Sequence, residues 1–240
     1  MVYRRRKGQL KKRWNVSANA FGYNLNMGST KAKRGLATAV KKIVKRSILE
    51  PKMYQAPEAT AAAVLHNTLY SINLFSGIAK GTDEDNRIGD YTNIKSVSIK
   101  LFTEGLTAGA IAPVIYRVLV LKSKVANATA GWLSSHIGST QIFYNYGNGL
   151  CAQWNAQKVH VLCEKQYTVH PQFNLDKPFS VHHFSCPIGQ FVFDDQGSDN
   201  LGRYWNYYMV VIPYQQGGTD GVTVLGDLTV NWIVSFTDSK

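Results

Sequence analysis

The sequence predicts an all-β fold, an eight-stranded antiparallel jelly-roll sandwich behind a basic N-terminal arm that contains a short amphipathic helix. Three observations predict it. Short segments rich in β-branched and aromatic residues recur from residue 64 to the end. Gly-, Asn- and Asp-rich stretches separate them, and no helical periodicity of useful length follows residue 63. The positive charge is concentrated in the first fifth of the chain.

The charge distribution divides the chain in two. Residues 1–49 contain 14 Lys and Arg and no Asp or Glu, whereas residues 50–240 contain 13 basic and 15 acidic residues. The two parts therefore carry +14 and −2 of the total of +12. A uniformly basic fold would indicate a binding face on the domain itself. This pattern indicates an almost neutral body with a cationic tail for a polyanion.

The arm, residues 1–50, is expected to have a disordered start and a helix. Residues 1–30 show neither helical nor strand periodicity, so we expect this part to be disordered when free. Over residues 33–49, aliphatic residues fall on one side of a helical wheel and cations on the other. The aliphatic side comprises Leu36, Ala39, Val40, Ile43 and Val44, and the cationic side Lys41, Lys42, Lys45 and Arg46. Pro51 follows the end of this helix.

Residues 51–63, with Pro51 and Pro57, are interpreted as a connector, and residues 64–240 as the jelly-roll domain. The predicted strands are 65–74, 93–102, 114–122, 141–146, 158–170, 179–193, 204–213 and 222–236. Their connections are too long for simple hairpins, which favours a two-sheet jelly roll. An immunoglobulin-like sandwich is the nearest alternative, but its Cys…Trp…Cys spacing is missing.

An ordered set of motifs carries a resemblance to a known family. A basic arm and short cationic helix precede a strand, a polar loop ending in Arg87-Ile88-Gly89-Asp90, and a strand with Lys95-Ser96-Val97-Ser98-Ile99-Lys100. The stretches at 158–168 and 206–211 also agree with it. This order resembles the single-jelly-roll capsid proteins of small viruses. The nearest groups are circular single-stranded DNA viruses related to circoviruses, and coat proteins of the satellite tobacco necrosis virus type.

The resemblance implies a self-assembling, icosahedral (T=1) virion shell of sixty identical subunits, with the arm facing inward. A single-stranded genome is the expected cargo, and the opening Arg run favours DNA over RNA. The expected locations are the virion and, during infection, the host nucleus and cytoplasm. We expect no membrane insertion, because the most apolar stretch, 111–121, contains Pro113 and Arg117 and is too short to span a bilayer.

The arm cations are the predicted nucleic-acid-binding residues, because cations bind phosphate by releasing counterions and need little sequence information. They are Arg4, Arg5, Arg6, Lys7, Lys11, Lys12, Arg13, Lys31, Lys33, Arg34, Lys41, Lys42, Lys45 and Arg46. The first seven also fit a nuclear-import signal read by host import factors. A solvated tail, or a helix lying on a membrane, are the alternatives for this charge run.

The interleaved aromatics Trp14, Phe21 and Tyr23 could stack on unpaired bases or pack against the inside of a shell.

Metal and cofactor signals are weak. Asp83, Glu84, Asp85 and Asp90 could hold a structural Ca²⁺, but their spacing does not match an EF-hand, and a solvated acidic turn is favoured. Asp194, Asp195 and Asp199 invite the same interpretation. His182 and His183 precede Cys186, yet adjacent residues of a strand point to opposite faces. We therefore expect no metal site and no other cofactor.

The three cysteines, Cys151, Cys163 and Cys186, are widely spaced and are expected to be free thiols.

Catalysis has little support, since the chain lacks G-x-S-x-G, H-E-x-x-H and P-loop motifs. We expect that the protein is not an enzyme. Two other classes stay open: a non-capsid jelly-roll binding module, either a lectin or a nucleic-acid-binding protein with a cationic tail, and a metal-dependent nuclease.

Overall fold

The computed structural model describes residues 15–18, 23–26, 38, 51–105, 112–126, 137–170, 179–194 and 200–238. The chain divides into two compact units, Met1–Glu50 and Pro51–Lys240. In the first unit, β1 (Asn15–Ala18) pairs antiparallel with β2 (Tyr23–Asn26), and Thr38 is helical. The hairpin lies where we expected a disordered start. The rest of the predicted helix, 33–49, lies outside the described residues.

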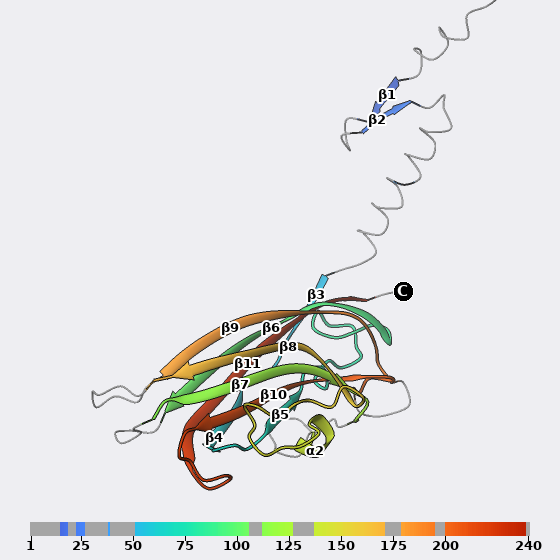
Figure 1. Cartoon of the computed structure of the whole chain (residues 1–240). Coiled ribbons are helices and arrows are strands. Elements are labelled where there is room, and N and C mark those ends of the chain that lie inside the picture. The colour runs from blue at the N-terminus through green and yellow to red at the C-terminus, as the bar shows by residue number, and fades with distance from the viewer. Residues whose placement is uncertain are drawn as a thin grey trace, which may run out of the picture. The chain divides into compact units, whose positions relative to one another are not determined.

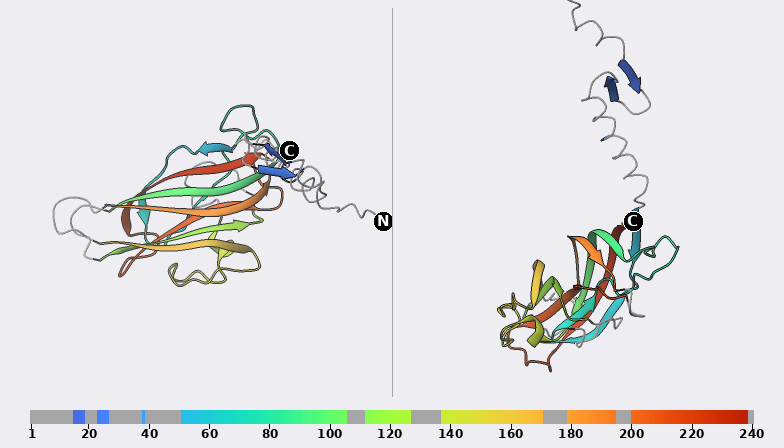
Figure 2. Two further views of the ribbon diagram at one scale, coloured as in Figure 1. Left: turned by 90° about the horizontal axis from the view of Figure 1, so that it is seen from above. Right: turned by 90° about the vertical axis from the view of Figure 1, so that its right-hand side faces the viewer.

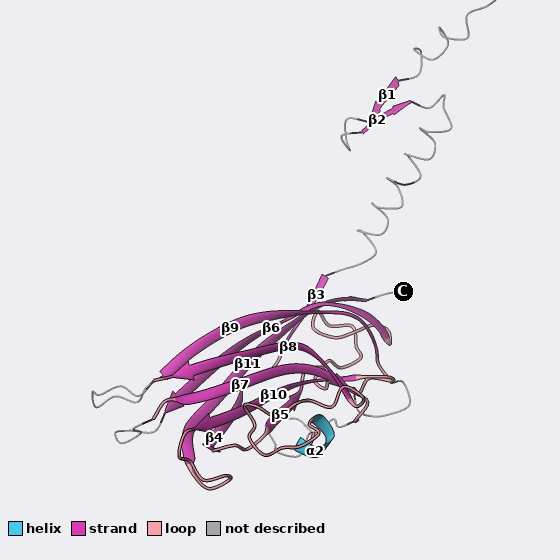
Figure 3. Cartoon of the chain, in the orientation of Figure 1, coloured by secondary structure: helices cyan, strands magenta, loops and turns pink. Residues whose placement is uncertain are grey.

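The second unit is built almost wholly of strands (Figure 3). One short helix, α2 (Ser139–Ile142), is described in it. The strands are β3 (Pro51–Gln55), β4 (Ala59–Leu65), β5 (Tyr70–Asn73), β6 (Tyr91–Gly105), β7 (Val114–Ser123), β8 (Val159–Val169), β9 (Phe179–Val192), β10 (Asn206–Gln215) and β11 (Val224–Asp238).

The strand order defines a jelly roll. One sheet has the order β5-β10-β7-β8, and the other β3-β11-β6-β9, with β4 also paired to β11. Every listed pairing within these sheets is antiparallel. When β4 is counted as the first of eight strands, strands one, eight, three and six form one sheet and strands two, seven, four and five form the other. The chain thus crosses repeatedly between two stacked sheets (Figures 1 and 2), and the predicted fold class is confirmed.

Three predicted segments differ from the structure. The connector expected at 51–63 instead contains β3 and β4, both paired to β11. The strand expected at 65–74 is a corner, because Asn67 takes a positive φ of 52° between the end of β4 and the start of β5. The strand expected at 141–146 begins as α2, whose start is held by a hydrogen bond from Gly138 N–H to the side chain of Gln141.

Two separate hydrophobic layers stabilise the body. The main core lies between the sheets and includes Val97, Ile99, Met209, Val234 and Phe236. A second cluster lies on the other face of the four-stranded sheet, where the segment around α2 covers it. It comprises Leu69, Leu119, Leu121, Ile137, Ile142, Phe143, Ala152, Val159, Tyr208, Val210 and Ile212. The four-stranded sheet is therefore buried on both faces, which explains the continuous apolar runs of β7 and β10.

Candidate functional site

The outer face of the five-stranded sheet carries a polar surface, which we call the open sheet face. Inward residues of β6, β9 and β11 such as Ile99, Phe184 and Val234 are buried, and the residues that alternate with them point outward. The open sheet face is defined by Gln55, Ser98, Lys100, His183, Ser185, Asn231 and Ile233.

A pocket of about 340 Å³ lies on this face. Lys100 is paired in register with His183 on one side and Asn231 on the other, and Ser98 Oγ lies 3.2 Å from His183 Nε2. Gln55, Glu58, Trp232 and Ile233 complete the lining. One ammonium group, an imidazole and neutral polar groups converge here, a set that suits a polar or anionic ligand.

An apolar cluster interrupts the polar surface at the start of β9. Phe179 and Val181 are 62% and 61% exposed, and the Phe102 ring stacks on Phe179 with ring centroids 6.1 Å apart. Because β9 is an edge strand of its sheet, exposed apolar side chains here are suited to contact another protein surface.

At the other end of the same sheet, buried ion pairs fix the first strand of the body. Lys52 Nζ donates to the carbonyl oxygen of Asn86 at 2.6 Å and lies 3.3 Å from Asp238 Oδ2. The side chains of Lys52 and Asp238 are only 6% and 13% exposed. The pair joins β3 to the end of β11, so the point where the arm enters the body is rigidly held.

The Arg87-Ile88-Gly89-Asp90 turn is a structural lock. Arg87 Nη1 donates to Asp90 Oδ1 at 2.7 Å, and the guanidinium lies 4.0 Å from the centroid of the Phe193 ring. Lys80 Nζ lies 3.3 Å from the same carboxylate oxygen. The hydrogen bond from Arg87, together with the nearby Lys80, lowers the pKa of Asp90 below its ordinary value.

The acidic loop offers little for Ca²⁺. Asp90 is bound by the two cations, and Asp83 accepts a hydrogen bond from Asn86. Within the described ranges, no three His, Cys, Asp or Glu side chains cluster as metal ligands would. Asp195 and Asp199 lie outside those ranges.

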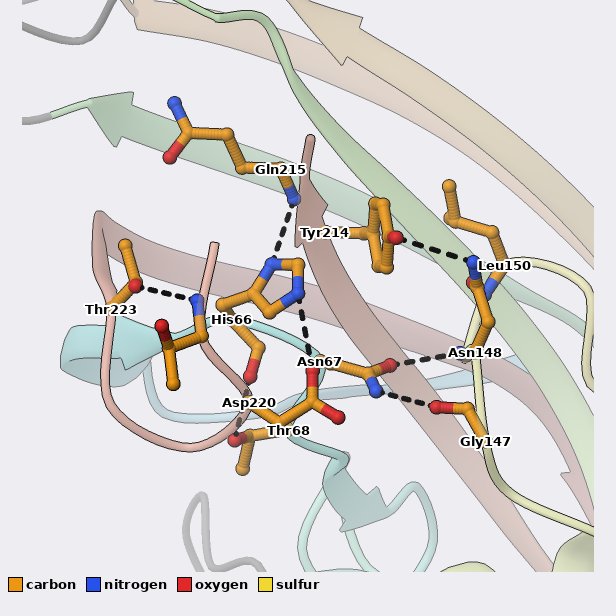
Figure 4. Close-up of polar contacts among 12 residues, drawn as sticks. His66, Asn67, Thr68, Gly147, Asn148, Leu150, Tyr214, Gln215, Asp220 and Thr223 are labelled. Atoms are coloured by element: carbon orange, nitrogen blue, oxygen red, sulfur yellow. Dashed lines mark hydrogen bonds and ion pairs between the residues drawn. The ribbon is translucent and has the colours of Figure 1, made fainter. Parts of the chain in front are cut away.

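A polar junction centred on His66 and Asn67 ties three loops together (Figure 4). His66 Nδ1 accepts a hydrogen bond from Gln215 N–H at 3.0 Å, while Nε2 lies 3.2 Å from Asp220 Oδ1. Since Nδ1 accepts, Nε2 carries the proton of the neutral ring. Asn67 Nδ2 donates to Gly147 O and Asn67 Oδ1 accepts from Gly149 N–H, both at 2.8 Å. The junction connects the β4–β5 corner, the 147–150 segment and the β10–β11 loop.

Arg117, noted in the sequence only as a break in an apolar run, holds the covering segment on the four-stranded sheet. It is 3% exposed. Its Nη1 donates to Gly149 O at 2.7 Å and Ala152 O at 2.8 Å, and its Nε donates to Glu164 at 2.8 Å. A lone Arg in an otherwise apolar strand was the available signal of a buried, paired charge.

The two histidines of β9 point to opposite faces, as predicted. His183 reaches Ser98 on the open sheet face, whereas His182 stacks on Tyr167 at 3.9 Å between ring centroids. Desolvation lowers the pKa of His182. All three cysteines are free, as expected, and burial raises the pKa of the Cys186 thiol to about 11.

The fourteen cations predicted to bind nucleic acid, including the seven of the import signal, lie outside the described residues. Those predictions stay predictions. The described portion contains no helix long and apolar enough to span a bilayer.

These features define a jelly-roll β-sandwich protein with one covered sheet, one open sheet face and a basic N-terminal arm. No protein-family model and no curated protein matches the chain. Among solved structures, it is similar to a chain of Desmodium yellow mottle tymovirus, at 11% sequence identity and a TM-score of 0.34, over 79% of this chain and 88% of that one. A TM-score this low defines no fold, so the assignment rests on the strand order alone.

Proposed function

We propose that this protein is a viral coat protein whose jelly-roll body assembles with its own copies into a closed shell and whose basic arm binds the packaged genome. The observation that carries the proposal is the combination of one fold with one charge distribution. A jelly-roll body of net charge −2 follows a segment of +14. Jelly rolls recur in capsid domains, and a cationic tail on a nearly neutral body separates polyanion binding from self-association.

The body supports the self-association half of this proposal. The open sheet face and the exposed apolar side chains of Phe179 and Val181 leave surface for neighbouring subunits, while the buried pairs of Lys52 and Arg87 keep the arm-bearing end rigid. None of these groups needs to perform a reaction, and we propose a structural protein rather than an enzyme.

In its finer form, the proposal is a small icosahedral shell of sixty subunits that packages single-stranded nucleic acid, in particular DNA. Fourteen cations per subunit would neutralise on the order of 800 phosphates in such a shell, at one phosphate per cation. This is a useful share of a small genome. The arm's first seven cations would also serve nuclear import before assembly.

The pocket on the open sheet face favours a second candidate, a jelly-roll binding module of lectin or nucleic-acid-binding type. Its volume of about 340 Å³ lies in the range of small-molecule sites, and its lining is mostly polar. In this alternative the body binds its ligand as a monomer, and the arm only adds charge.

Negative-stain electron microscopy and sedimentation of the full-length protein, with and without single-stranded DNA, test the two candidates. Coat function predicts uniform closed particles of this one chain. A variant lacking residues 1–30 should keep the β-sheet circular dichroism of the body but form shells that hold less nucleic acid. A full-length protein that stays monomeric at high concentration with DNA present contradicts the coat proposal and leaves the binding module.

A further inference from the structure

A cationic and aromatic cluster lies at one end of the sandwich, apart from the arm cations and the open sheet face. The ammonium groups of Lys122 and Lys124 lie 5.1 and 5.6 Å from the centroid of the Trp205 ring. The His160 ring meets the same indole edge-on, with centroids 5.4 Å apart. We call Lys122, Lys124, His160, Arg203, Tyr204 and Trp205 the Trp205 patch.

The fold builds this patch from three strands. Lys122 is paired in register with His160 on one side and Tyr207 on the other, so β8 and β10 place their first residues beside the end of β7. Trp205 packs against the main core, and the cations lie over its ring at the end of the space between the two sheets.

A tight turn holds Trp205 in place. Gly202 N–H donates to Asn206 Oδ1 at 2.8 Å, and a side chain at Gly202 would meet the Trp205 carbonyl oxygen and the Phe191 ring. The turn leaves Arg203 exposed and the Tyr204 ring 62% exposed. The indole is thus a fixed platform, and a second aromatic ring faces solvent next to it.

The charges of the patch are not neutralised within the described part of the chain. Lys122, Lys124 and Arg203 take part in none of the ion pairs found there, unlike Lys52, Lys80, Arg87 and Arg117. Two ammonium groups gathered at one indole, with a guanidinium nearby, form a positive surface that favours an anion.

The patch lies at the end of the body to which the arm is joined. Arg203 N–H donates to Val192 O at the end of β9, and Val192 pairs with Tyr91 at the start of β6. The next residue of β6, Thr92, pairs with Asp238 of β11, whose neighbour Thr237 pairs with Pro51. Pro51 directly follows the arm in sequence, and Figure 1 shows β3 and the C-terminus at this end.

We propose that the Trp205 patch is a second nucleic-acid contact, located on the jelly-roll body. Lys122, Lys124 and Arg203 bind phosphates of an unpaired strand, and the exposed Tyr204 ring stacks on a base. Exposed aromatics beside free cations suit a single strand better than an acidic protein loop, which offers no base to stack. This inference rests on the proposed function, since it takes the packaged strand as the ligand.

The test is the salt dependence of binding of labelled oligothymidylate to the full-length protein, measured by fluorescence anisotropy. Two lost phosphate contacts should lower the slope of log K against log[salt] by about 1.4, at about 0.7 per contact. The variant Lys122→Gln/Lys124→Gln should show this decrease and bind about 25-fold more weakly at 0.1 M salt, if the two lines meet near 1 M. Tyr204→Leu should weaken binding and leave the slope unchanged, because it removes stacking and no charge.

The matched control is Lys95→Gln/Lys165→Gln, which removes the same charge from two other exposed lysines. It should bind with an almost unchanged slope. Lys122→Arg/Lys124→Arg should restore the slope, which separates lost charge from a damaged fold.

A normal slope for Lys122→Gln/Lys124→Gln overturns the inference. The proposed function survives that result if replacing the arm cations still lowers the slope. If this variant binds the oligonucleotide normally but no longer forms particles, the patch contacts a neighbouring copy, and the inference is again wrong. If no form of the protein binds single strands, the genome-binding part of the proposed function fails as well.

Discussion

At the scale of single residues, buried charges determine how the loops of this protein are held. Arg117 lies in a strand whose other side chains are almost all buried, and it has a partner for each direction in which its guanidinium points. A buried guanidinium is tolerated only when such partners are present, and removing either side leaves polar groups unsatisfied. The same reasoning applies to Arg87 and Asp90 at the other end of the body.

Replacing Arg117 with Met keeps much of the side-chain volume but removes the donors for Gly149, Ala152 and Glu164. We expect a loss of about 3 kcal/mol of unfolding free energy, since two buried carbonyl groups lose a charged donor. Urea unfolding followed by circular dichroism measures it. The exposed Lys165→Met on the neighbouring β8 serves as the control and should change stability by less than about 0.5 kcal/mol. An equally small effect of Arg117→Met would show that the guanidinium does not anchor the covering segment.

Asp90 gives a pH-dependent contribution to stability. Its pKa in the folded protein lies below the ordinary value of 3.8, first because of the hydrogen bond from Arg87 and further because of Lys80. The folded state therefore binds this proton less readily than the unfolded chain does. The stabilisation is complete above the unfolded pKa, and it is lost as the pH falls through the lowered folded pKa.

The variant Asp90→Asn should accordingly be less stable than the native protein at neutral pH, and the difference should shrink below about pH 4. The measurement is the unfolding free energy of both proteins from neutral pH to about pH 2. Glu58→Gln, which removes an exposed carboxyl outside the described ion pairs, should show no such convergence. A difference between Asp90→Asn and the native protein that is constant over this range would exclude the ion-pair explanation.

At the scale of elements, hydrophobic patterns predicted the long strands and missed the short ones. The strand expected at 93–102 is β6, Tyr91–Gly105, and the one at 114–122 is β7, Val114–Ser123. Here side-chain alternation, or an unbroken apolar run, extends over enough residues to be recognised. The small residues of β4, Ala59–Leu65, carry no such pattern, and β4 is a strand because its backbone pairs with β11. The pairing is a tertiary effect that local sequence does not encode.

The candidate sites follow the same division. A run of cations is visible in the sequence wherever it occurs, so the arm could be recognised as a polyanion-binding segment. The Trp205 patch combines Lys122 with a residue more than eighty positions away, and the His66 junction joins three distant loops. Such sites depend on strand order and register, which the sequence constrained only as far as the fold class.

The second hydrophobic layer makes its own prediction. Met209 lies in the main core and Leu119 in the cluster beneath the α2 segment, and both are fully buried. If the four-stranded sheet is covered on both faces, Met209→Ala and Leu119→Ala should each cost about 2–5 kcal/mol of unfolding free energy. Val181→Ala is the comparison, because Val181 is 61% exposed on the outer face of the other sheet, and it should cost less than about 0.5 kcal/mol. Chemical denaturation distinguishes these outcomes, and a neutral Leu119→Ala would mean that the α2 segment does not pack on the sheet.

At the scale of the whole molecule, charge and core are allotted to different units. The hydrophobic clusters both belong to Pro51–Lys240, while Met1–Glu50 carries the excess positive charge. Changes in the arm should therefore alter affinity for polyanions without altering the stability of the body. This separation is what a shell subunit requires, because the contacts between copies must persist while the arm adapts to irregular nucleic acid.

Replacing Arg4, Arg5, Arg6, Lys7, Lys11, Lys12 and Arg13 with Gln tests this separation directly. The net charge falls by seven, from +12 to +5. If each cation contacts one phosphate, the slope of log K against log[salt] for a single strand should decrease by about 5, at about 0.7 per contact. The unfolding free energy of the body should stay within about 0.5 kcal/mol of the native value, since no core residue changes.

A control with Arg and Lys exchanged at the same seven positions keeps the charge and should keep the slope, because counterion release depends on the number of phosphates neutralised rather than on the shape of the cation. Salt titrations of binding to oligothymidylate, together with urea unfolding of each variant, supply both measurements. An unchanged slope in the Gln variant would show that these seven cations do not contact the strand. A large loss of body stability would instead show that the arm forms part of the folded core, and the two-unit division of function would be wrong.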